Sequence, residues 1–145
     1  MNRWGRRYGY TDYVAVGSTQ TVRLDDLVAG EPVDVIKMDV EGMEAEVAKG
    51  WERLFNRRPP FLVLTEFIPS LIAEKSNASS PLAFLRFFLE HDYIIRLQKQ
   101  VDNVNATVSS VAVLPHLAAH CARAIGCDLA MQHVRSPVSF FPVHD

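Results

Sequence analysis

Residues 33–50 read VDVIKMDVEGMEAEVAKG, and this stretch decides the fold. Its first eight residues are nearly continuous in Val, Ile and Met instead of alternating with polar residues. That pattern predicts a strand at 33–40 which is buried on both faces of a parallel sheet. Three glutamates, Glu41, Glu44 and Glu46, follow directly. The segment therefore predicts an apolar strand whose carboxyl end carries acidic side chains.

A helix is expected after this strand, over about 42–55. Its apolar stripe has spacings of 4, 4 and 3, the period of one helix face, and consists of Met43, Val47, Trp51 and Leu54. The run FLVLTEF at 61–67 then predicts a second buried strand. Because a helix joins them, we expect the strands at 33–40 and 61–67 to be adjacent, parallel and central in the sheet.

The remaining elements have weaker signals. Short strands are expected at 13–16 and 21–24, the second followed by Asp25 or Asp26 as the cap of a helical turn. Farther along, the pattern predicts a helix at 81–91 with Pro81 in its first turn, strands at 93–97 and 108–114, and a helix at 115–133. The last two strands are expected to pair antiparallel, because no helical pattern separates them. The chain thus reads as one α/β domain, 1–145, with a mostly parallel sheet and an antiparallel edge strand.

The composition is that of a soluble globular protein. Of the 145 residues, 48% are hydrophobic and 22% are charged, which suits one domain with a real core. A net charge of -2 and a pI near 6.2 leave no basic surplus for a nucleic-acid backbone. No apolar run approaches the roughly 18 residues of a membrane helix, and no signal peptide is recognisable. We therefore expect a cytoplasmic protein with neither a nucleic-acid nor a membrane partner.

The two cysteines give no sign of a metal site. Cys121 and Cys127 lie six residues apart, which matches neither a CxxC motif nor a zinc-binding pattern. We expect both to be reduced and to pack as small apolar residues in or near the core. Two sequons, at 77–79 and 105–107, would accept glycans only in a secreted protein.

Carboxylates gather where the two main strands end. Asp39 and Glu41 follow the strand at 33–40, and Glu66 lies near the end of the strand at 61–67. In an open α/β sheet, ligands bind beyond the carboxyl ends of the strands. We therefore take Asp39, Glu41 and Glu66 as the candidate catalytic residues. Asp39 is the first choice for a general base, because a buried strand would hold it rigidly.

Structural roles remain open for the same side chains. Acidic residues at the start of a helix interact favourably with its dipole, by about 0.3 to 1 kcal/mol each, which alone accounts for Glu41 and Glu44. Lys37 lies two residues before Asp39 and is a candidate ion-pair partner for it. Glu66 can equally be a solvated strand end. A magnesium site on these carboxylates is the weakest alternative, because nothing fixes six ligands, and no metal site is assigned.

Three segments of the chain resemble the FkbM-type methyltransferases. They are LDDL at 24–27, VDVIKMDVEGMEAEVAKGWERL at 33–54 and PPFLVLTEF at 59–67. The family pattern has Leu-Asp-Asp-Leu, an apolar strand ending in Lys-x-Asp-x-Glu-Gly-x-Glu, a helix with Gly, and a strand ending in Glu. The matching positions are Leu24, Asp25, Lys37, Asp39, Glu41, Gly42, Glu44, Gly50 and Glu66. The resemblance is clearest over 21–97 and corresponds to the carboxyl-terminal half of the family's domain.

The resemblance implies a partial Rossmann-like methyltransferase fold. It also implies methyl transfer from S-adenosylmethionine to a hydroxyl of a sugar or other small molecule, with Asp39, Glu41 or Glu66 on the acceptor side. The glycine-rich loop that holds the cofactor in such enzymes has no counterpart here, because the glycines form neither GxGxxG nor Asp-x-Gly-x-x-x-Gly. No cofactor-binding residue is therefore assigned, and we expect this chain alone to lack the cofactor-binding half, to bind S-adenosylmethionine weakly and to be inactive. The rival hypothesis is an inactive, truncated domain that serves as an interaction module, its exposed sheet edge covered by a partner.

Overall fold

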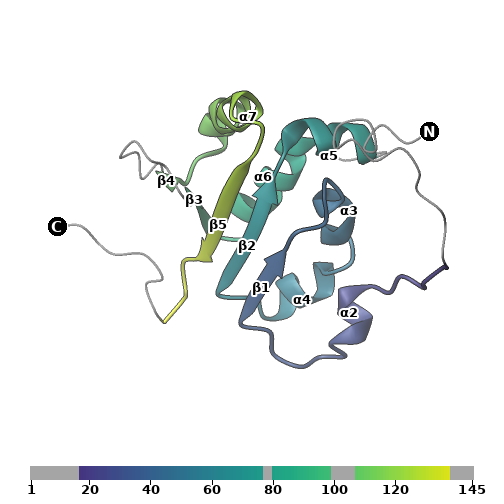
Figure 1. The fold of residues 1–145 in the computed structure, drawn as a ribbon. Coiled ribbons are helices and arrows are strands. Elements are labelled where there is room, and N and C mark those ends of the chain that lie inside the picture. The colour runs from purple at the N-terminus through teal and green to yellow at the C-terminus, as the bar shows by residue number, and fades with distance from the viewer. Residues whose placement is uncertain (1–16, 77–79, 99–106, 138–145) are drawn as a thin grey trace.

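A computed structural model describes residues 17–76, 80–98 and 107–137 of the chain. These residues form one five-stranded sheet with helices packed against it (Figure 1). The strands are β1 (Val35–Met38), β2 (Leu62–Phe67), β3 (Tyr93–Leu97), β4 (Thr107–Val108) and β5 (Cys127–His133). The helices are α2 (Leu24–Leu27), α3 (Glu44–Ala48), α4 (Glu52–Arg57), α5 (Pro69–Lys75), α6 (Pro81–Glu90), the short 3-10 helix η1 (Val111–Val113) and α7 (Leu114–Arg123). The predicted strand at 13–16 lies outside the described residues.

The strand order is β1-β2-β5-β3-β4. β1 and β2 are adjacent and parallel, as the sequence predicts, and β4 pairs antiparallel with β3 at an edge. The expectation of a mostly parallel sheet is wrong, because β5 runs antiparallel between β2 and β3. The sheet is therefore mixed. Among the described residues β1 forms its other edge, so the prediction that β1 is central is also wrong.

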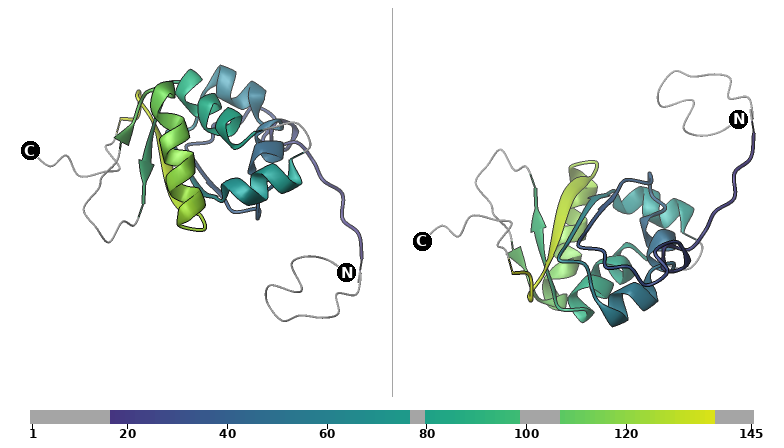
Figure 2. Two further views of the ribbon diagram at one scale, coloured as in Figure 1. Left: turned by 90° about the horizontal axis from the view of Figure 1, so that it is seen from above. Right: turned by 90° about the horizontal axis from the view of Figure 1, so that it is seen from below.

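The unexpected strand β5 comes from the segment that was predicted as one helix over 115–133. The helix α7 ends at Arg123, and the chain then turns through Ile125 and Gly126, whose φ angles are 62° and 125°. The strand sequence, CDLAMQH, contains no β-branched residue, so its composition favours a helix. Hydrogen bonding to neighbours on both sides overrides that preference. Figure 2 shows β5 from above and below, with α7 packed beside the sheet.

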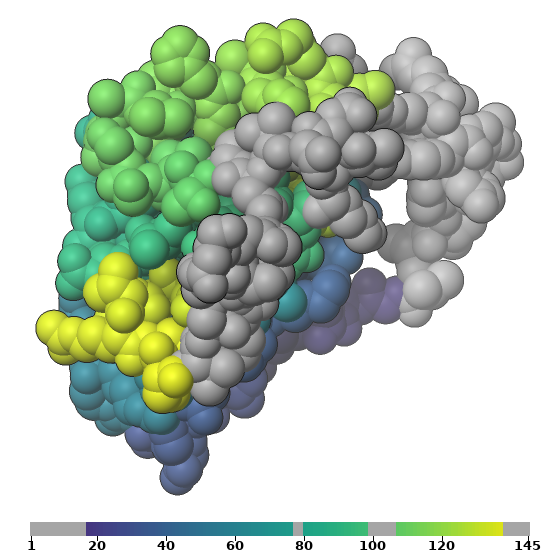
Figure 3. All heavy atoms as spheres, turned by 90° about the vertical axis from the view of Figure 1, so that its left-hand side faces the viewer, coloured from purple at the N-terminus to yellow at the C-terminus, as the bar shows by residue number. Residues whose placement is uncertain are grey.

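Two other predicted strands also differ from the structure. The segment at 21–24 is not a strand, because α2 begins at Leu24. The segment at 108–114 contributes only its first residue to β4, after which η1 and α7 follow. The Ser110 hydroxyl accepts the N–H of Ala112, and Pro115 lies in the first turn of α7, so the chain enters a helix. Figure 3, which looks from the left-hand side of Figure 1, shows α7 at the top of the surface and the yellow C-terminal end of β5 below it.

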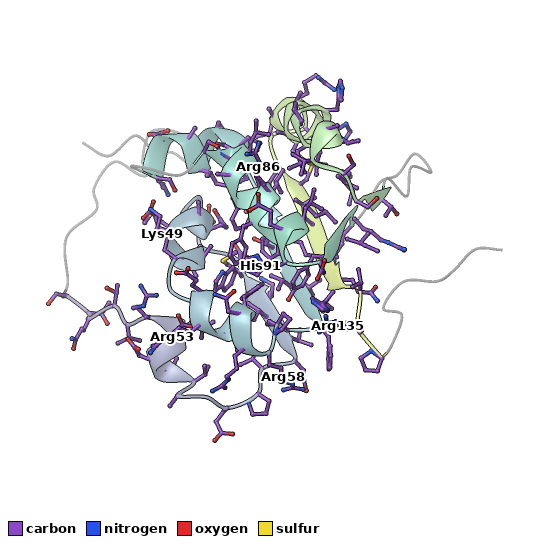
Figure 4. The ribbon with its side chains drawn as sticks, turned by 180° about the vertical axis from the view of Figure 1, so that it is seen from behind. Lys49, Arg53, Arg58, Arg86, His91 and Arg135 are labelled. Carbon is purple, nitrogen blue, oxygen red and sulfur yellow. A yellow bond between two sulfur atoms is a disulfide. The ribbon has the colours of Figure 1, made fainter. Side chains whose placement is uncertain are left out.

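The helix expected over 42–55 is two helices, α3 and α4, which are separated by residues 49–51. Asp25 explains why a second helix, α4, begins after this break. Its carboxylate accepts the backbone N–H groups of Arg53 and Leu54, at 3.1 and 2.9 Å, and so caps α4 from α2 (Figure 4, which labels Arg53). Asp25 therefore caps α4, and not the helical turn directly after it that the sequence predicted. Burial raises the pKa of Asp25, yet the hydrogen bonds from Leu54 and Arg53 outweigh burial and hold this pKa below its ordinary value.

The break between α3 and α4 changes which residues form the core. Met43 and Val47 are 39% and 36% exposed, so the first half of the predicted stripe is wrong. Trp51 and Leu54 are buried, as predicted. The backbone carbonyl of Gly50 accepts the N–H of Asp25 at 2.8 Å, which ties the break to α2. The core is thus organised around the start of α4, on the side of the sheet that α3, α4 and α6 cover (Figure 4).

The cysteines are not reduced as expected, because a disulfide joins Cys121 to Cys127. It connects the last turn of α7 to the first residue of β5. Cys121 is fully buried, which agrees with the prediction that it packs in the core. No helix in the described part of the chain is long and apolar enough to cross a membrane.

Candidate functional site

The loop between β1 and α3 has an unusual backbone. The N–H of Met43 donates to the carbonyl of Val40 at 3.2 Å, and the two residues between them, Glu41 and Gly42, have φ angles of 55° and 93°. Positive φ at both central positions is the signature of a type I′ turn. A glutamate in this region is uncommon and is retained only where its surroundings enforce it. The turn therefore fixes the direction in which the chain leaves β1.

Glu44 holds this turn closed. Its Oε1 atom accepts the backbone N–H groups of Val40 and Gly42, at 3.3 and 3.2 Å, and the residue is only 1% exposed. Backbone donors that would otherwise be unpaired are satisfied in this way. Glu44 is thus a structural residue, and its acidic side chain is directed at the backbone of the loop.

The three predicted catalytic residues line a single cavity. Asp39, Glu41 and Glu66 meet at the carboxyl ends of β1 and β2, around a cavity of about 330 Å³. The other residues that line it are Lys37, Met38, Leu64, Thr65, Gln98, Asp128 and Leu129. The structure therefore brings together the side chains that the sequence placed at one edge of the sheet. Their catalytic role stays a prediction.

The strand register explains why these side chains meet. Lys37 is the parallel partner of Leu64, and Glu66 is the antiparallel partner of Asp128, so each pair lies on one face of the sheet. Side chains alternate along a strand, which places Glu66 opposite to the fully buried Val63 and Phe67. The acidic side chains thus lie on the face that points away from the main core.

Among the polar residues of the cavity, sequence reasoning missed Asp128 and Gln98, and it gave no site role to Thr65. Asp128 lies in β5, which was predicted as helix, and Gln98 directly follows β3. The N–H of Gln98 donates to the carbonyl of Asp128 at 2.8 Å, so the two are joined through the backbone. Gly126, a turn residue directly before β5, was the available signal that the helix ends and a new element begins.

The electrostatics single out Glu66. Partial burial, followed by the charges of Asp39, Glu41, Asp128 and Glu44, raises the pKa of Glu66 above its ordinary value. Asp39 has a different environment, because Lys37 donates to it at 3.1 Å and its side chain is 50% exposed. The ion pair that the sequence suggested is therefore present. A raised pKa suits a general base, so Glu66 is a candidate beside Asp39, and the choice between them stays a prediction.

Comparison with known protein families identifies the family of this chain. The description "Methyltransferase FkbM domain" matches residues 5–95, which is more than half of the chain. The chain belongs to the FkbM methyltransferase family. The match extends toward the N-terminus beyond the resemblance at 21–97. Neither a curated protein nor a solved structure gives a match.

The structure gives physical reasons for several positions of the FkbM pattern. Asp25 caps α4, Gly42 and Glu44 build the turn after β1, and Gly50 lies against the backbone of Arg23 and Leu24. These four positions hold the scaffold. Asp39, Glu41 and Glu66 are the pattern's acidic positions that line the cavity.

The cavity is lined by four carboxylate residues and one cation, Lys37, which Asp39 already engages. This lining alone does not exclude the methyl donor of the family, because S-adenosylmethionine carries an ammonium group, a sulfonium group and ribose hydroxyls as well as a carboxylate. Hydroxyl groups suit these side chains, because an ionised carboxylate accepts hydrogen bonds only. No group of three His, Cys, Asp or Glu side chains in the described segments is placed to hold a metal ion. The carboxylates of this cavity are therefore suited to a ligand that carries hydroxyl groups.

Proposed function

We propose that this chain forms the acceptor side of an S-adenosylmethionine-dependent O-methyltransferase with a Rossmann-like fold. Membership of the FkbM family supports methyl transfer, and the family implies the donor. The observation that carries the proposal is the position of Glu66, partly buried at a strand end and surrounded by three further carboxylate residues of one cavity. The acceptor is a small hydroxylated molecule or a glycan.

Glu66 acts as the general base of this proposal. An alcohol attacks a methyl group effectively only as its proton leaves, and Glu66 receives that proton at its carboxylate. Asp39 and Glu41 are more exposed and accept hydrogen bonds from other hydroxyl groups of the acceptor. The rigid end of β2 holds the base in place, which contributes alignment.

The cofactor is proposed to bind through residues outside this cavity. S-Adenosylmethionine supplies an electrophilic methyl group when it is bound. The carboxylates of the cavity suit the acceptor, and the glycines of the sequence form neither the GxGxxG nor the Asp-x-Gly-x-x-x-Gly loop that would hold the donor. We therefore propose that this chain alone binds the cofactor weakly and that the activity needs a further cofactor-binding segment.

Replacement of Glu66 by Gln tests the catalytic assignment. In whichever form of the protein transfers labelled methyl groups from S-adenosylmethionine to hydroxylated acceptors, Glu66→Gln should lower turnover by about a hundredfold or more, since general-base catalysis contributes about 10² to 10⁴. The melting temperature near pH 7 should stay unchanged or rise. A raised pKa means that ionised Glu66 is disfavoured in the folded state, so its stabilising contribution is present at low pH and is lost as the pH rises through the folded pKa.

Matched variants separate catalysis from structure in this assay. Glu90→Gln changes an exposed carboxylate that does not line the cavity, and it should leave turnover unchanged. Asp39→Asn and Glu41→Gln should have smaller effects than Glu66→Gln. If Glu66→Gln turns over like the parent while Asp39→Asn does not, Asp39 is the general base, as the sequence predicted. If all three variants behave like the parent, the acidic edge has no catalytic role.

A second candidate function is an inactive interaction module. The observation that favours it is the outer edge of β1, which has no strand partner among the described residues, with Val35 50% exposed. Such an edge is able to pair with a strand from a partner. In that case no form of the protein transfers methyl groups, while a partner protects the β1 amides from hydrogen exchange.

Location and other partners also remain proposals. We propose no nucleic-acid partner, because the net charge is -2. The cytoplasmic location expected from the sequence stays a prediction, and a disulfide between Cys121 and Cys127 is unusual for a reducing compartment. Fractionation of cells that produce the protein tests this point.

A further inference from the structure

The disulfide lies next to the candidate site. Cys127 is the first residue of β5, and Asp128, which lines the carboxylate cavity, directly follows it. A second cavity of about 320 Å³ is lined by Cys127 and shares Gln98 and Asp128 with the first. The two cavities are therefore neighbours, and the disulfide belongs to the wall beside the acidic site.

The two cysteine residues differ in burial. Cys121 is fully buried, whereas Cys127 is partly exposed and lines the second cavity. A thiol that enters this cavity contacts Cys127, whereas Cys121 is not among the lining residues. Thiol–disulfide exchange proceeds by attack of a thiolate on one sulfur of the bond, so access decides which sulfur is attacked.

Backbone hydrogen bonds join the disulfide in holding the turn between α7 and β5. The N–H of Gly126 donates to the carbonyl of Cys121 at 2.8 Å, and β5 then pairs Cys127 with Phe67 and Asp128 with Glu66. Ile125 and Gly126 both have positive φ, a conformation that the covalent link helps to enforce. Opposed carboxylates on neighbouring strands destabilise their pairing. The link to α7 therefore adds a covalent constraint to the pairing that holds the first residues of β5.

We propose that the Cys121–Cys127 disulfide is a thiol-exchange site, attacked at Cys127, whose redox state controls how firmly Asp128 and Glu66 are held. The reductant is a low-molecular-weight thiol such as glutathione. Its thiolate bonds to the Cys127 sulfur, the S–S bond breaks, and Cys121 leaves and takes a proton. A second thiolate then attacks the small-molecule sulfur of the mixed disulfide and releases Cys127. Two electrons pass from the two thiols to the protein. The part of this inference that concerns the regulation of methyl transfer rests on the proposed function.

Mass spectrometry of two single-cysteine variants tests the site of attack. In Cys121→Ser, the remaining Cys127 thiol should form a mixed disulfide with oxidised glutathione. In Cys127→Ser, the buried Cys121 should react at least about tenfold more slowly in the folded protein, because burial limits both thiolate formation and access. Equal rates, or faster reaction at Cys121, would overturn the assignment of Cys127. Circular dichroism shows whether each variant is folded. If a variant is unfolded, the oxidised parent protein is treated with reduced glutathione instead, and the glutathione adduct that is trapped shows which cysteine is attacked.

Hydrogen exchange tests the effect on the site. After reduction with glutathione, the amides of 127–129 and 65–67 should exchange faster, by about tenfold for a loosening of about 1.4 kcal/mol. Those of α6 should stay unchanged. The double variant Cys121→Ser/Cys127→Ser should match the reduced parent. Unchanged exchange at 127–129, or uniform acceleration throughout the chain, contradicts the proposal. Neither readout uses methyl transfer. The thiol-exchange proposal can therefore hold in a protein that has no methyltransferase activity, and it can fail in a protein that has this activity.

Discussion

Trp51→Ala should lower the free energy of unfolding by about 3 to 5 kcal/mol, the cost of deleting a large buried aromatic side chain. Trp51 is completely buried at the start of α4. Its ring lies 4.9 Å from that of Phe55, 6.4 Å from Phe87 and 6.1 Å from Phe88, measured between ring centroids. Rings from α4 and α6 surround it, so the helical layer cannot easily collapse into the space that remains. Urea denaturation followed by circular dichroism measures the loss.

Two further variants show whether this loss belongs to packing. Leu27→Ala removes an apolar side chain that is 69% exposed, and it should change the stability by no more than about 0.5 kcal/mol. Trp51→Phe keeps a ring at the position and should cost less than Trp51→Ala. The Nε1 atom of Trp51 has no hydrogen-bond partner among the described residues, so Phe forfeits no bond there. A loss below about 1 kcal/mol for Trp51→Ala would mean that α4 is not packed as described.

Gly42→Ala should destabilise the protein by about 2 to 5 kcal/mol, because two separate costs add. The φ angle of Gly42 is 93°, and left-handed backbone costs other residues about 1 to 2 kcal/mol. A Cβ atom at this position would lie 2.6 Å from the Cβ atom of Leu71 and 2.9 Å from its carbonyl carbon. Overpacking of this kind costs about 1 to 3 kcal/mol. Thermal and urea unfolding both measure the combined effect.

Gly17→Ala is the matched control for this substitution. It has no heavy atom within 4 Å of an added Cβ and does not have a positive φ, so its stability should stay close to that of the parent. Gly42→Ala should also shift the turn that positions Glu41, and therefore reduce turnover more than its stability loss explains. If Gly42→Ala unfolds like Gly17→Ala, then α5 does not approach the loop as closely as the structure shows.

Local signals predicted the elements whose residues repeat a clear pattern. The apolar runs of β1 and β2 predicted that these strands are adjacent and parallel. The helical spacing of apolar residues in α6 predicted the bounds of this helix closely. β5 could not be found in this way, because its neighbours on both sides impose a strand on a helix-favouring composition. The break at 49–51 was equally hidden, since Asp25 caps α4 from a distant part of the sequence.

The site was predictable as far as it depends on strand ends. Asp39, Glu41 and Glu66 follow or end apolar runs, and the parallel register brings them to one cavity. Their relative roles depend on tertiary contacts. Asp39 has a salt bridge with Lys37, and Glu66 is surrounded by other carboxylates. Asp128 escaped notice because it reaches the cavity only through the unexpected strand.

The central claim is that carboxylates from the loop after β1, from β2 and from β5 act on one another as a single site. A carbon-13 NMR titration of the Glu66 carboxyl group, assigned by comparison with Glu66→Gln, tests this claim without substrate or cofactor. We expect a pKa above that of an ordinary glutamate, in the direction that burial and the neighbouring charges impose. Asp128→Asn should lower it, whereas Asp34→Asn, which changes an exposed carboxylate outside the cavity, should not. A Glu66 that titrates like a free glutamate and is insensitive to Asp128→Asn would contradict the account.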